Sequence, residues 1–169
     1  YSDVDQGDDL SAVLVAGPGH GSLTLHANGS FSYAPEPDFN GSDSFSYRVN
    51  DGSTDSNLAN VAITVTPVND PPVAQDDAAS LLRNTSTLID VLGNDSDIDG
   101  GALVITAVGD AEHGLVEIET GKLRYTPNID FFGVDSFTYS VADGNGGTAS
   151  AQVVVAIQFD NRAPVANDG

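Results

Sequence analysis

Internal repetition constrains the fold of this chain more than any other sequence feature. Motifs in the first half of the 169 residues return in the second half, most of them 92 positions later. Matching pairs include Tyr33 with Tyr125, Phe45 with Phe137, Asp51 with Asp143, Pro72 with Pro164, and the nearby pair His20-Gly21 with His113-Gly114. A fixed period of this kind is typical of tandem structural units. The chain therefore contains two copies of one unit of about 90 residues.

Proline-rich stretches at 67–74 and 160–166 mark the boundaries between copies, and proline keeps such short linkers stiff. We expect an incomplete repeat over 1–69, a complete repeat over 70–162 and the start of a further repeat over 163–169. The segment Ser2-Asp3-Val4-Asp5 aligns with Ser96-Asp97-Ile98-Asp99. The first copy then lacks the equivalent of roughly Val73 to Asp95, which predicts an unpaired sheet edge. Such a unit is either truncated or completed by another chain.

Short segments with a period of two predict β-strands. Phe137, Tyr139 and Val141 alternate with polar residues, which places one face on a core and the other in water. Turns at Asn28-Gly29 and Thr120-Gly121 predict hairpins, and no stretch has helical periodicity. In the complete copy we expect strands at 86–92, 103–108, 115–119, 122–126, 136–142 and 149–157, with another starting at Asp76 or Asp77. The sequence therefore predicts an all-β chain of two tandem immunoglobulin-like β-sandwich domains with about seven strands each.

The charge composition excludes several classes of partner. With 25 Asp and Glu against 5 Lys and Arg, the formal net charge is −20, which disfavours nucleic acid and anionic membranes and favours divalent cations. The absence of cysteine removes disulfides, thiolate chemistry and cysteine-based zinc sites. No segment is as long and apolar as a transmembrane helix, so membrane insertion is not expected. With no Met and a first residue of Tyr1, the chain looks excised from a longer one, so the lack of a signal peptide is uninformative.

One acidic stretch has the composition of a calcium-binding loop. Asp95, Asp97 and Asp99 stand at alternate positions before Gly100, and carboxylates this close repel one another unless a cation joins them. Ca²⁺ takes hard oxygen ligands at this spacing, with a glycine at the turn. The EF-hand pattern is only half matched, because Thr106 stands where its bidentate Glu would be. Further ligands would come from elsewhere; alternatively, the aspartates only form Asx-turns and keep the loop soluble.

The sandwich topology predicts that other acidic residues meet this loop at the same end of the complete unit. The loop between the last two strands carries Asp143 and Asn145, and the entering linker carries Asn69 and Asp70. We therefore expect Ca²⁺ at the junction between the two units, where it would fix their angle. The remaining candidates lie in the first copy: Asp3, Asp5 and Asp51, together with the loop that carries Glu36, Asp38, Asn40 and Asp43.

Some conspicuous residues have simpler interpretations. Asp43 and Asp135 each stand just before the aromatic positions of a strand, so they either bind the metal or only accept backbone N–H bonds in the turn. His20 and His113 have no second His or Cys nearby, which favours a turn or packing role. Most Tyr and Phe residues occupy inward positions and indicate core packing. The sequence has no nucleophile-elbow motif, and calcium explains its paired carboxylates better than glycoside hydrolysis does, so we expect no enzyme.

Several motifs together resemble one known family. They are Asp95-x-Asp97-x-Asp99-Gly100, Tyr125-Thr126-Pro127, Phe132-Gly133-x-Asp135-Ser136-Phe137-x-Tyr139 and Val141-x-Asp143-Gly144. The set is similar to the bacterial cadherin-like tandem repeats, also called tandem-95, VCBS-type or bacterial Ig-like repeats, of large secreted RTX-type adhesins. The resemblance implies a Greek-key sandwich, an extracellular or bacterial cell-surface location, and calcium within or between repeats. One departure is Arg83-Asn84-Thr85, where many relatives carry an acidic Glu-Asp-Thr.

Three functions fit these observations. The first is a calcium-rigidified spacer or adhesion segment whose partners are calcium ions and the neighbouring repeats of the same polypeptide. The second is a carbohydrate-binding module attached to a secreted polysaccharide-active protein, with surface glycans as partners, although the absence of Trp counts against it. The third is homophilic adhesion through a sheet edge.

Overall fold

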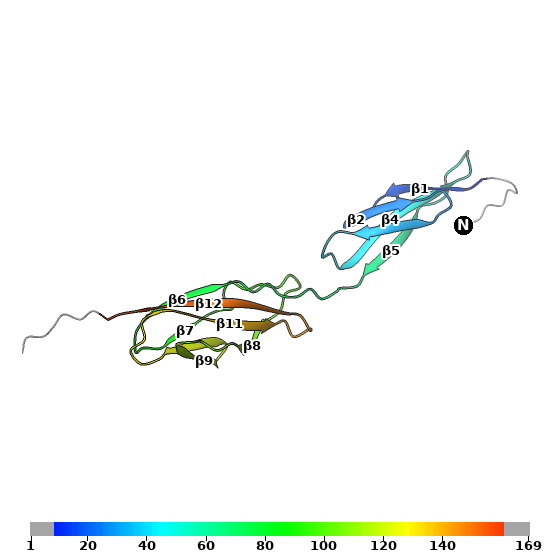
Figure 1. The fold of residues 1–169 in the computed structure, drawn as a ribbon. Coiled ribbons are helices and arrows are strands. Elements are labelled where there is room, and N and C mark those ends of the chain that lie inside the picture. The colour runs from blue at the N-terminus through cyan, green and yellow to red at the C-terminus, as the bar shows by residue number, and fades with distance from the viewer. Residues whose placement is uncertain (1–8, 161–169) are drawn as a thin grey trace, which may run out of the picture. The chain divides into compact units, whose positions relative to one another are not determined.

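The computed structural model describes residues 9–160, which fall into two compact units, one up to Val68 and one from Asn69 onward (Figure 1). We call these unit 1 and unit 2. All regular structure in the described range is β-strand. No helix of sufficient length and apolarity to cross a membrane occurs in that range.

Unit 2 is a β-sandwich of seven strands in two sheets. The larger sheet has the strand order β6-β12-β11-β8 and the smaller sheet the order β7-β10-β9. β6 pairs with β12 in parallel, whereas the other neighbouring strands are antiparallel. The strands are β6 (Asp77–Leu82), β7 (Thr87–Ile89), β8 (Val104–Val108), β9 (Gly114–Glu119), β10 (Lys122–Pro127), β11 (Gly133–Ala142) and β12 (Thr148–Gln158). The chain changes sheet after β6, β7, β8 and β10, and this confirms the predicted Greek-key sandwich.

The long hairpin of β11 and β12 organises unit 2. Its register runs without interruption from the pair Gly133 and Ile157 to the pair Ala142 and Thr148. Along β11, Phe137, Tyr139 and Val141 are buried, whereas the residues between them face outward. The predicted period of two is therefore confirmed.

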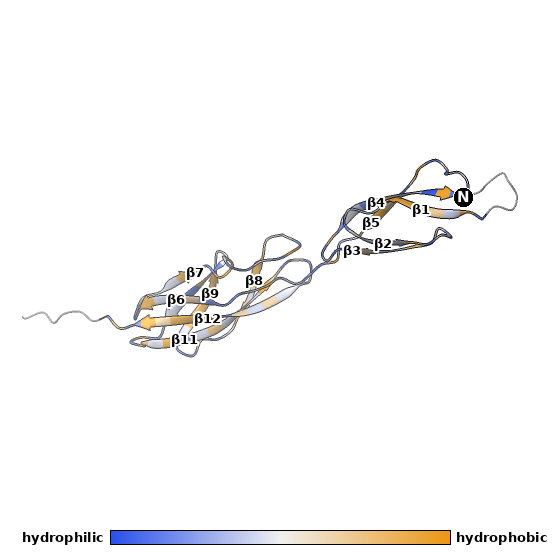
Figure 2. Ribbon diagram, turned by 90° about the horizontal axis from the view of Figure 1, so that it is seen from above, coloured by the Kyte–Doolittle hydropathy of each residue, from blue (hydrophilic) through white to orange (hydrophobic). Residues whose placement is uncertain are grey.

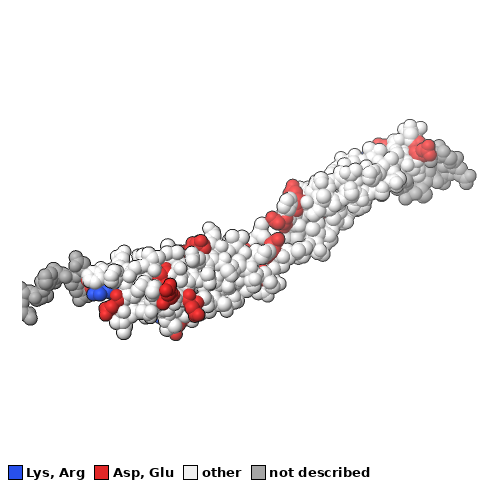
Figure 3. Space-filling model, viewed as in Figure 1, with Lys and Arg blue, Asp and Glu red and all other residues white. Residues whose placement is uncertain are grey.

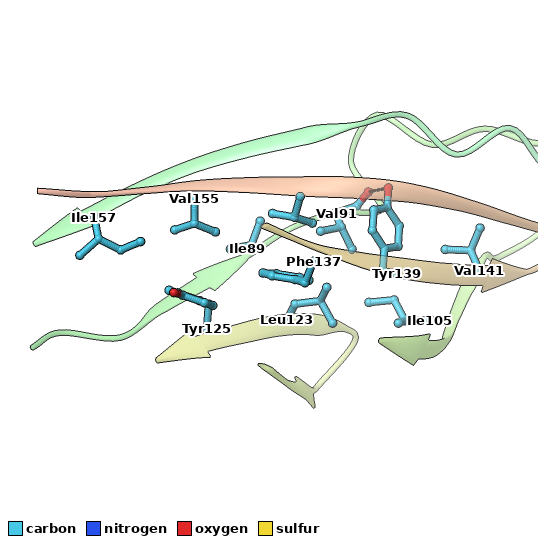
Figure 4. Packing of buried hydrophobic residues seen from close by; sticks show 11 residues of the cluster. Ile89, Val91, Ile105, Leu123, Tyr125, Phe137, Tyr139, Val141, Val155 and Ile157 are labelled. Atoms are coloured by element: carbon cyan, nitrogen blue, oxygen red, sulfur yellow. Dashed lines mark hydrogen bonds between the residues drawn. The ribbon is translucent and has the colours of Figure 1, made fainter. Parts of the chain in front are cut away.

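The hydrophobic core lies between the two sheets of unit 2. Figure 4 shows Phe137 of β11 lying near Leu123 and Tyr125 of β10, with Tyr139 and Val141 farther along β11. Full burial of a side chain of this size stabilises the fold by about 1.5–3 kcal/mol relative to exposure. The buried cluster consists of Ile89, Val91, Ile105, Leu123, Tyr125, Phe137, Tyr139, Val141, Val153, Val155 and Ile157. In Figure 2 the hydrophobic colour lies mainly on strands, as expected when turns carry the polar residues.

Unit 1 repeats part of this arrangement. Its sheets have the orders β1-β4-β5 and β2-β3, which correspond to β8-β11-β12 and β9-β10 of unit 2. The hairpin predicted at Asn28-Gly29 joins β2 to β3, and that at Thr120-Gly121 joins β9 to β10. Gly29, Thr120 and Gly121 all have positive φ, as such turns require. The strands are β1 (Ser11–Ala16), β2 (Gly21–Leu25), β3 (Phe31–Pro35), β4 (Gly41–Asn50) and β5 (Ala59–Val65).

The two units differ at their sheet edges. Within the described residues of unit 1, nothing corresponds to β6 and β7, so β5 and β3 each have an unpaired edge. Phe45 is also the one buried hydrophobic residue that the described part of unit 1 has, against eleven in unit 2. Unpaired edges of this kind can pair with another strand.

Candidate metal centre

The loop from Asp95 to Gly100 connects β7 to β8 and is folded by its own side chains. The Asp97 carboxylate accepts a hydrogen bond from the Asp99 N–H over 2.8 Å, and the Gly100 N–H contacts the Asp97 carbonyl at 3.3 Å. Gly100 has φ of 77°, a conformation that favours glycine. The residue before the turn is fixed as well, because Ser96 and Val73 exchange two backbone hydrogen bonds of 2.8 and 3.0 Å. The aspartates thus form the Asx-turn that the second interpretation of this loop requires.

The loop between β11 and β12 is built around Asp143. Oδ1 of Asp143 accepts hydrogen bonds from the N–H groups of Asn145 and Gly147, at 2.7 and 3.0 Å. Oδ2 accepts a hydrogen bond from Nδ2 of Asn69, at 2.7 Å. The bond from Asn69 is the main reason that the pKa of Asp143 is lowered; burial opposes it, and the backbone bonds act with it. Asp143 is therefore held as a carboxylate anion.

The entering linker joins both loops. Asn69 binds Asp143, and the N–H of the next residue, Asp70, donates to Oδ2 of Asp99 over 2.6 Å. These contacts link positions 74 and 29 residues apart in the sequence. Of the sequence-predicted ligands, the structure therefore brings Asn69, Asp70, Asp97, Asp99 and Asp143 to one end of unit 2, which we call the acidic pole.

Within the acidic pole, Asp97 has an oxygen without a partner. Oδ2 of Asp97 is buried and accepts no hydrogen bond, whereas Oδ1 accepts the Asp99 N–H. An unsatisfied buried polar atom costs about 1–3 kcal/mol, and more when the group is charged. Residues 9–160 nevertheless contain no group of three Asp, Glu, His or Cys side chains arranged to hold a metal ion. Any cation here would also need the Asn69 side chain or carbonyl oxygens as ligands.

Asp95 lies apart from the other two aspartates of its loop. Its carboxylate accepts hydrogen bonds from the Gln75 N–H at 2.9 Å and from the Tyr139 hydroxyl at 3.0 Å. Tyr139 is buried, and burial, followed by the bond to Asp95, raises the pKa of its hydroxyl. Beside them, Asp77 has one buried oxygen without a partner, and burial raises the pKa of Asp77. The sequence grouped Asp95 with Asp97 and Asp99, but the structure points it at a core tyrosine.

In unit 1 the candidate ligands have other roles. Asp51 accepts hydrogen bonds from the N–H groups of Ser53 and Thr54 and from the Thr54 hydroxyl, so it closes its own loop. The backbone bond from Thr54 is the main cause of the lowered pKa of Asp51. Asp3 and Asp5 lie outside the described residues.

The Asp43 carboxylate accepts four hydrogen bonds that hold a turn together. Oδ1 accepts the N–H groups of Gly19 and Ser44, and Oδ2 accepts the His20 N–H and the Tyr33 hydroxyl, all within 3.0 Å. Burial alone would raise the pKa of Asp43, but these bonds outweigh it and lower the pKa to about 2. These bonds are the ones that the second interpretation of the sequence expects, in which Asp43 accepts backbone N–H groups in the turn.

Sequence reasoning assigned Tyr33, Tyr125 and Tyr139 to core packing and missed the bonds of their hydroxyl groups. In unit 2 the Tyr125 hydroxyl donates to Oδ2 of Asp135 over 2.7 Å, and this carboxylate also accepts the His113 N–H. Stacking of His113 on Phe131 and of His20 on Phe39 accords with the packing role expected for both histidines. The tyrosine–aspartate pairs could have been found, because they recur with the same spacing of 10 residues in both copies.

This fold and these sites define a protein of tandem cadherin-like and immunoglobulin-like β-sandwich domains. The profile of the bacterial Ig domain family matches residues 69–156, and that of the bacterial cadherin-like domain family matches residues 1–67. The chain therefore belongs to the bacterial Ig domain family, and its first 67 residues match the bacterial cadherin-like family, which confirms the resemblance seen in the sequence. Domains of these families are typically extracellular and not enzymes.

Solved cadherin structures are similar in fold alone. The human CDH23 EC21-23 structure aligns over 94% of this chain and 66% of its own, with 17% identity and a TM-score of 0.67. The Drosophila N-cadherin EC1-4 structure aligns over 96% of this chain and 45% of its own, with 16% identity and a TM-score of 0.60.

Among curated proteins, the Arabidopsis thaliana protein GAMETE EXPRESSED 2 is 34% identical over 84 residues, 50% of this chain. Integrin beta-like protein E of Dictyostelium discoideum is 27% identical over 138 residues, 72% of the chain. The matches span only 9% and 7% of those two proteins.

Proposed function

We propose that this chain is a calcium-stiffened segment of a repeat array in a large bacterial surface adhesin of the RTX type. In this role the acidic pole of unit 2 binds Ca²⁺ and fixes the linker that enters the unit. Asp97, Asp99 and Asp143 would supply carboxylate oxygens, and Asn69 and Asp70 would complete the set from the linker. Bound calcium would neutralise the carboxylates and supply no chemistry beyond holding these segments together.

The observation that carries this proposal is the buried, unpartnered Oδ2 of Asp97. It lies in the loop that the linker already contacts through Asp70 and Asp99, and the chain has 25 acidic residues against 5 basic ones. A divalent cation satisfies such an oxygen and removes the repulsion between neighbouring carboxylates. The linker would then be rigid only where calcium is plentiful, as it is outside cells.

A calcium titration tests the proposal. Extracellular calcium modules bind with dissociation constants of about 10⁻⁴–10⁻³ M, and tenfold that concentration adds about 1.4 kcal/mol for one site. This predicts a rise of roughly 6–11 °C in the melting temperature of unit 2. Asp97→Asn should abolish the rise and keep the fold, because the amide has the same shape. The matched control is Asp110→Asn, an exposed acid elsewhere in the unit. If calcium does not change the melting temperature, the proposal is wrong and the acidic pole is a solvated, hydrogen-bonded surface.

A second candidate function is homophilic adhesion, and the unpaired edges of β3 and β5 favour it. Exposed edge strands pair readily with another chain. Sedimentation velocity over a range of protein concentrations tests this candidate. Concentration-dependent association would support it, and a monomer at all concentrations would exclude it.

A further inference from the structure

The end of unit 2 opposite the acidic pole carries exposed hydrophobic side chains. Ile129 is 88% exposed, Phe132 60% and Phe159 53%, and the rings of Phe132 and Phe159 meet edge to face with centroids 5.7 Å apart. Leu82, at the end of β6, is also exposed. We call these four residues, together with Arg83, the apolar pole. Exposed hydrophobic groups gathered in this way mark an interaction site.

Polar contacts hold the apolar pole in shape. The Arg83 guanidinium lies 4.2 Å from the centre of the Phe159 ring, and its Nη1 is 3.6 Å from Oδ1 of Asp130. The Asn84 side chain accepts the Asp130 N–H at 2.8 Å and donates to Oδ1 of Asp130 at 3.1 Å. Beside them is a depression of about 270 Å³, lined by Leu82, Arg83, Asn84, Thr85 and Asp160. The surface is therefore formed before any partner arrives.

Comparison with unit 1 shows that folding does not require these hydrophobic residues. At the positions equivalent to Ile129, Phe132 and Phe159, the first copy has Pro37, Asn40 and Pro67. Around them the repeated features are kept: Asp38 and Asp130 both have positive φ, and His20 and His113 both stack on a phenylalanine. The apolar pole is thus a specific addition to unit 2.

The charges of the apolar pole also differ from those of the acidic pole. Arg83 lies against Asp130, so a protein cation already balances that carboxylate. In the linker that follows, Arg162 stands at the position equivalent to Asp70, one of the proposed calcium ligands. Arg83 and Arg162 are two of the 5 basic residues of this very acidic chain, and Arg162 follows Phe159 by three positions in the sequence. In Figure 3 the blue of Lys and Arg appears beside the C-terminal end of the described residues.

We propose that the apolar pole is the docking surface for the following repeat of the same polypeptide, and that this junction forms without calcium. The proposal rests on the repeat array proposed above. Ala163-Pro164-Val165-Ala166 matches Pro71-Pro72-Val73-Ala74, so the sequence after Asp160 starts a repeat. From Phe159 to Ala163, where the next repeat starts, the chain advances four residues and can span at most about 14 Å. This short connection keeps the next unit beside Phe159 at high effective concentration. By repetition that unit presents an acidic pole, which complements Arg83 and Arg162.

A tryptophan probe tests the docking, because the chain has no Trp. Phe132→Trp is placed in the present chain and in an extended chain, in which residues 1–168 are followed by a second copy of residues 77–160. We expect acrylamide quenching of the indole to fall at least threefold on extension, equally in EDTA and in calcium. Arg83→Glu should reverse the fall. Asn40→Trp, at the equivalent position of unit 1, is the matched control for an indole outside an apolar pole.

Other outcomes would overturn the proposal. An indole quenched equally in both chains would show that the following repeat does not dock there, and burial only in calcium would show an ordinary metal junction. Burial that grows with the concentration of the unextended chain would assign the apolar pole to a second copy. Hydrogen exchange on the unsubstituted chains, at 82–85 and 129–134, gives the same comparison without a substitution. Failure of the Asp97→Asn test leaves this result unaffected, so the two proposals can fail separately.

Discussion

Asn69 and Asp143 are 74 residues apart in the sequence, yet Nδ2 of Asn69 lies 2.7 Å from Oδ2 of Asp143. This one bond ties the start of unit 2 to the loop between its two longest strands. Because Asp143 also accepts N–H groups of its own loop, the linker and the loop form one hydrogen-bonded structure. The direction in which the chain enters unit 2 therefore depends on a carboxylate.

Asn69→Ala tests this dependence. The Asn69 bond is the main cause of the lowered pKa of Asp143, so the substitution should raise that pKa toward its ordinary value. The pKa can be followed by NMR of the Asp143 carboxyl carbon, and Asn57→Ala, whose amide bonds only the adjacent Leu58, is the control. An unchanged pKa in Asn69→Ala would mean that the backbone bonds of the loop determine it.

The sequence predicted most of this fold because it depends on periodicity. Phe137, Tyr139 and Val141 alternate with polar residues, and glycines mark the hairpins, so strands and turns followed from local patterns. Repetition then predicted which segments of the two copies correspond. Side-chain direction was harder, since D-x-D-x-D-G spacing places three carboxylates close together but does not say where each one points. Asp95 turns toward Tyr139 because Ser96 pairs with Val73, a contact that only the tertiary fold creates.

Gly147→Ala should disrupt the acidic pole. A Cβ at this position would lie 2.2 Å from Oδ2 of Asp143 and 2.9 Å from the Cα of Pro71, so the loop or the linker must move. We expect a loss of about 1–3 kcal/mol in the free energy of unfolding and a weaker response to calcium. Chemical denaturation with and without calcium measures both effects. Gly93→Ala is the matched control, because its Cβ would meet only the Asp90 carbonyl oxygen at 3.5 Å; equal effects of the two substitutions would contradict the prediction.

Acid should destabilise unit 1 through Asp43. The pKa of Asp43 is about 2 in the folded chain, below its ordinary value of 3.8, so the unfolded chain binds the proton more readily. The contribution of Asp43 to stability is therefore complete above pH 4 and is lost as the pH falls from about 4 to about 2. Melting temperatures across this range should fall more steeply for the natural chain than for Asp43→Asn. If both chains show the same slope, other carboxylates cause the acid sensitivity.

Tyr125→Phe and Tyr33→Phe remove the equivalent hydroxyl from the two copies of one tyrosine–aspartate pair. The two substitutions should lower the free energy of unfolding by different amounts. Tyr125 and Asp135 are both buried, so loss of the 2.7 Å bond leaves a buried carboxylate with fewer partners. Such a loss costs about 1–3 kcal/mol, or more for a charged group. Tyr33 is only half-buried, and water can replace its 2.9 Å bond to Asp43, so the second substitution should cost clearly less. Denaturant unfolding that resolves the two units measures both values. Equal losses would show that the strength of the pair does not depend on burial, and that the open edges of unit 1 do not admit water to Asp43.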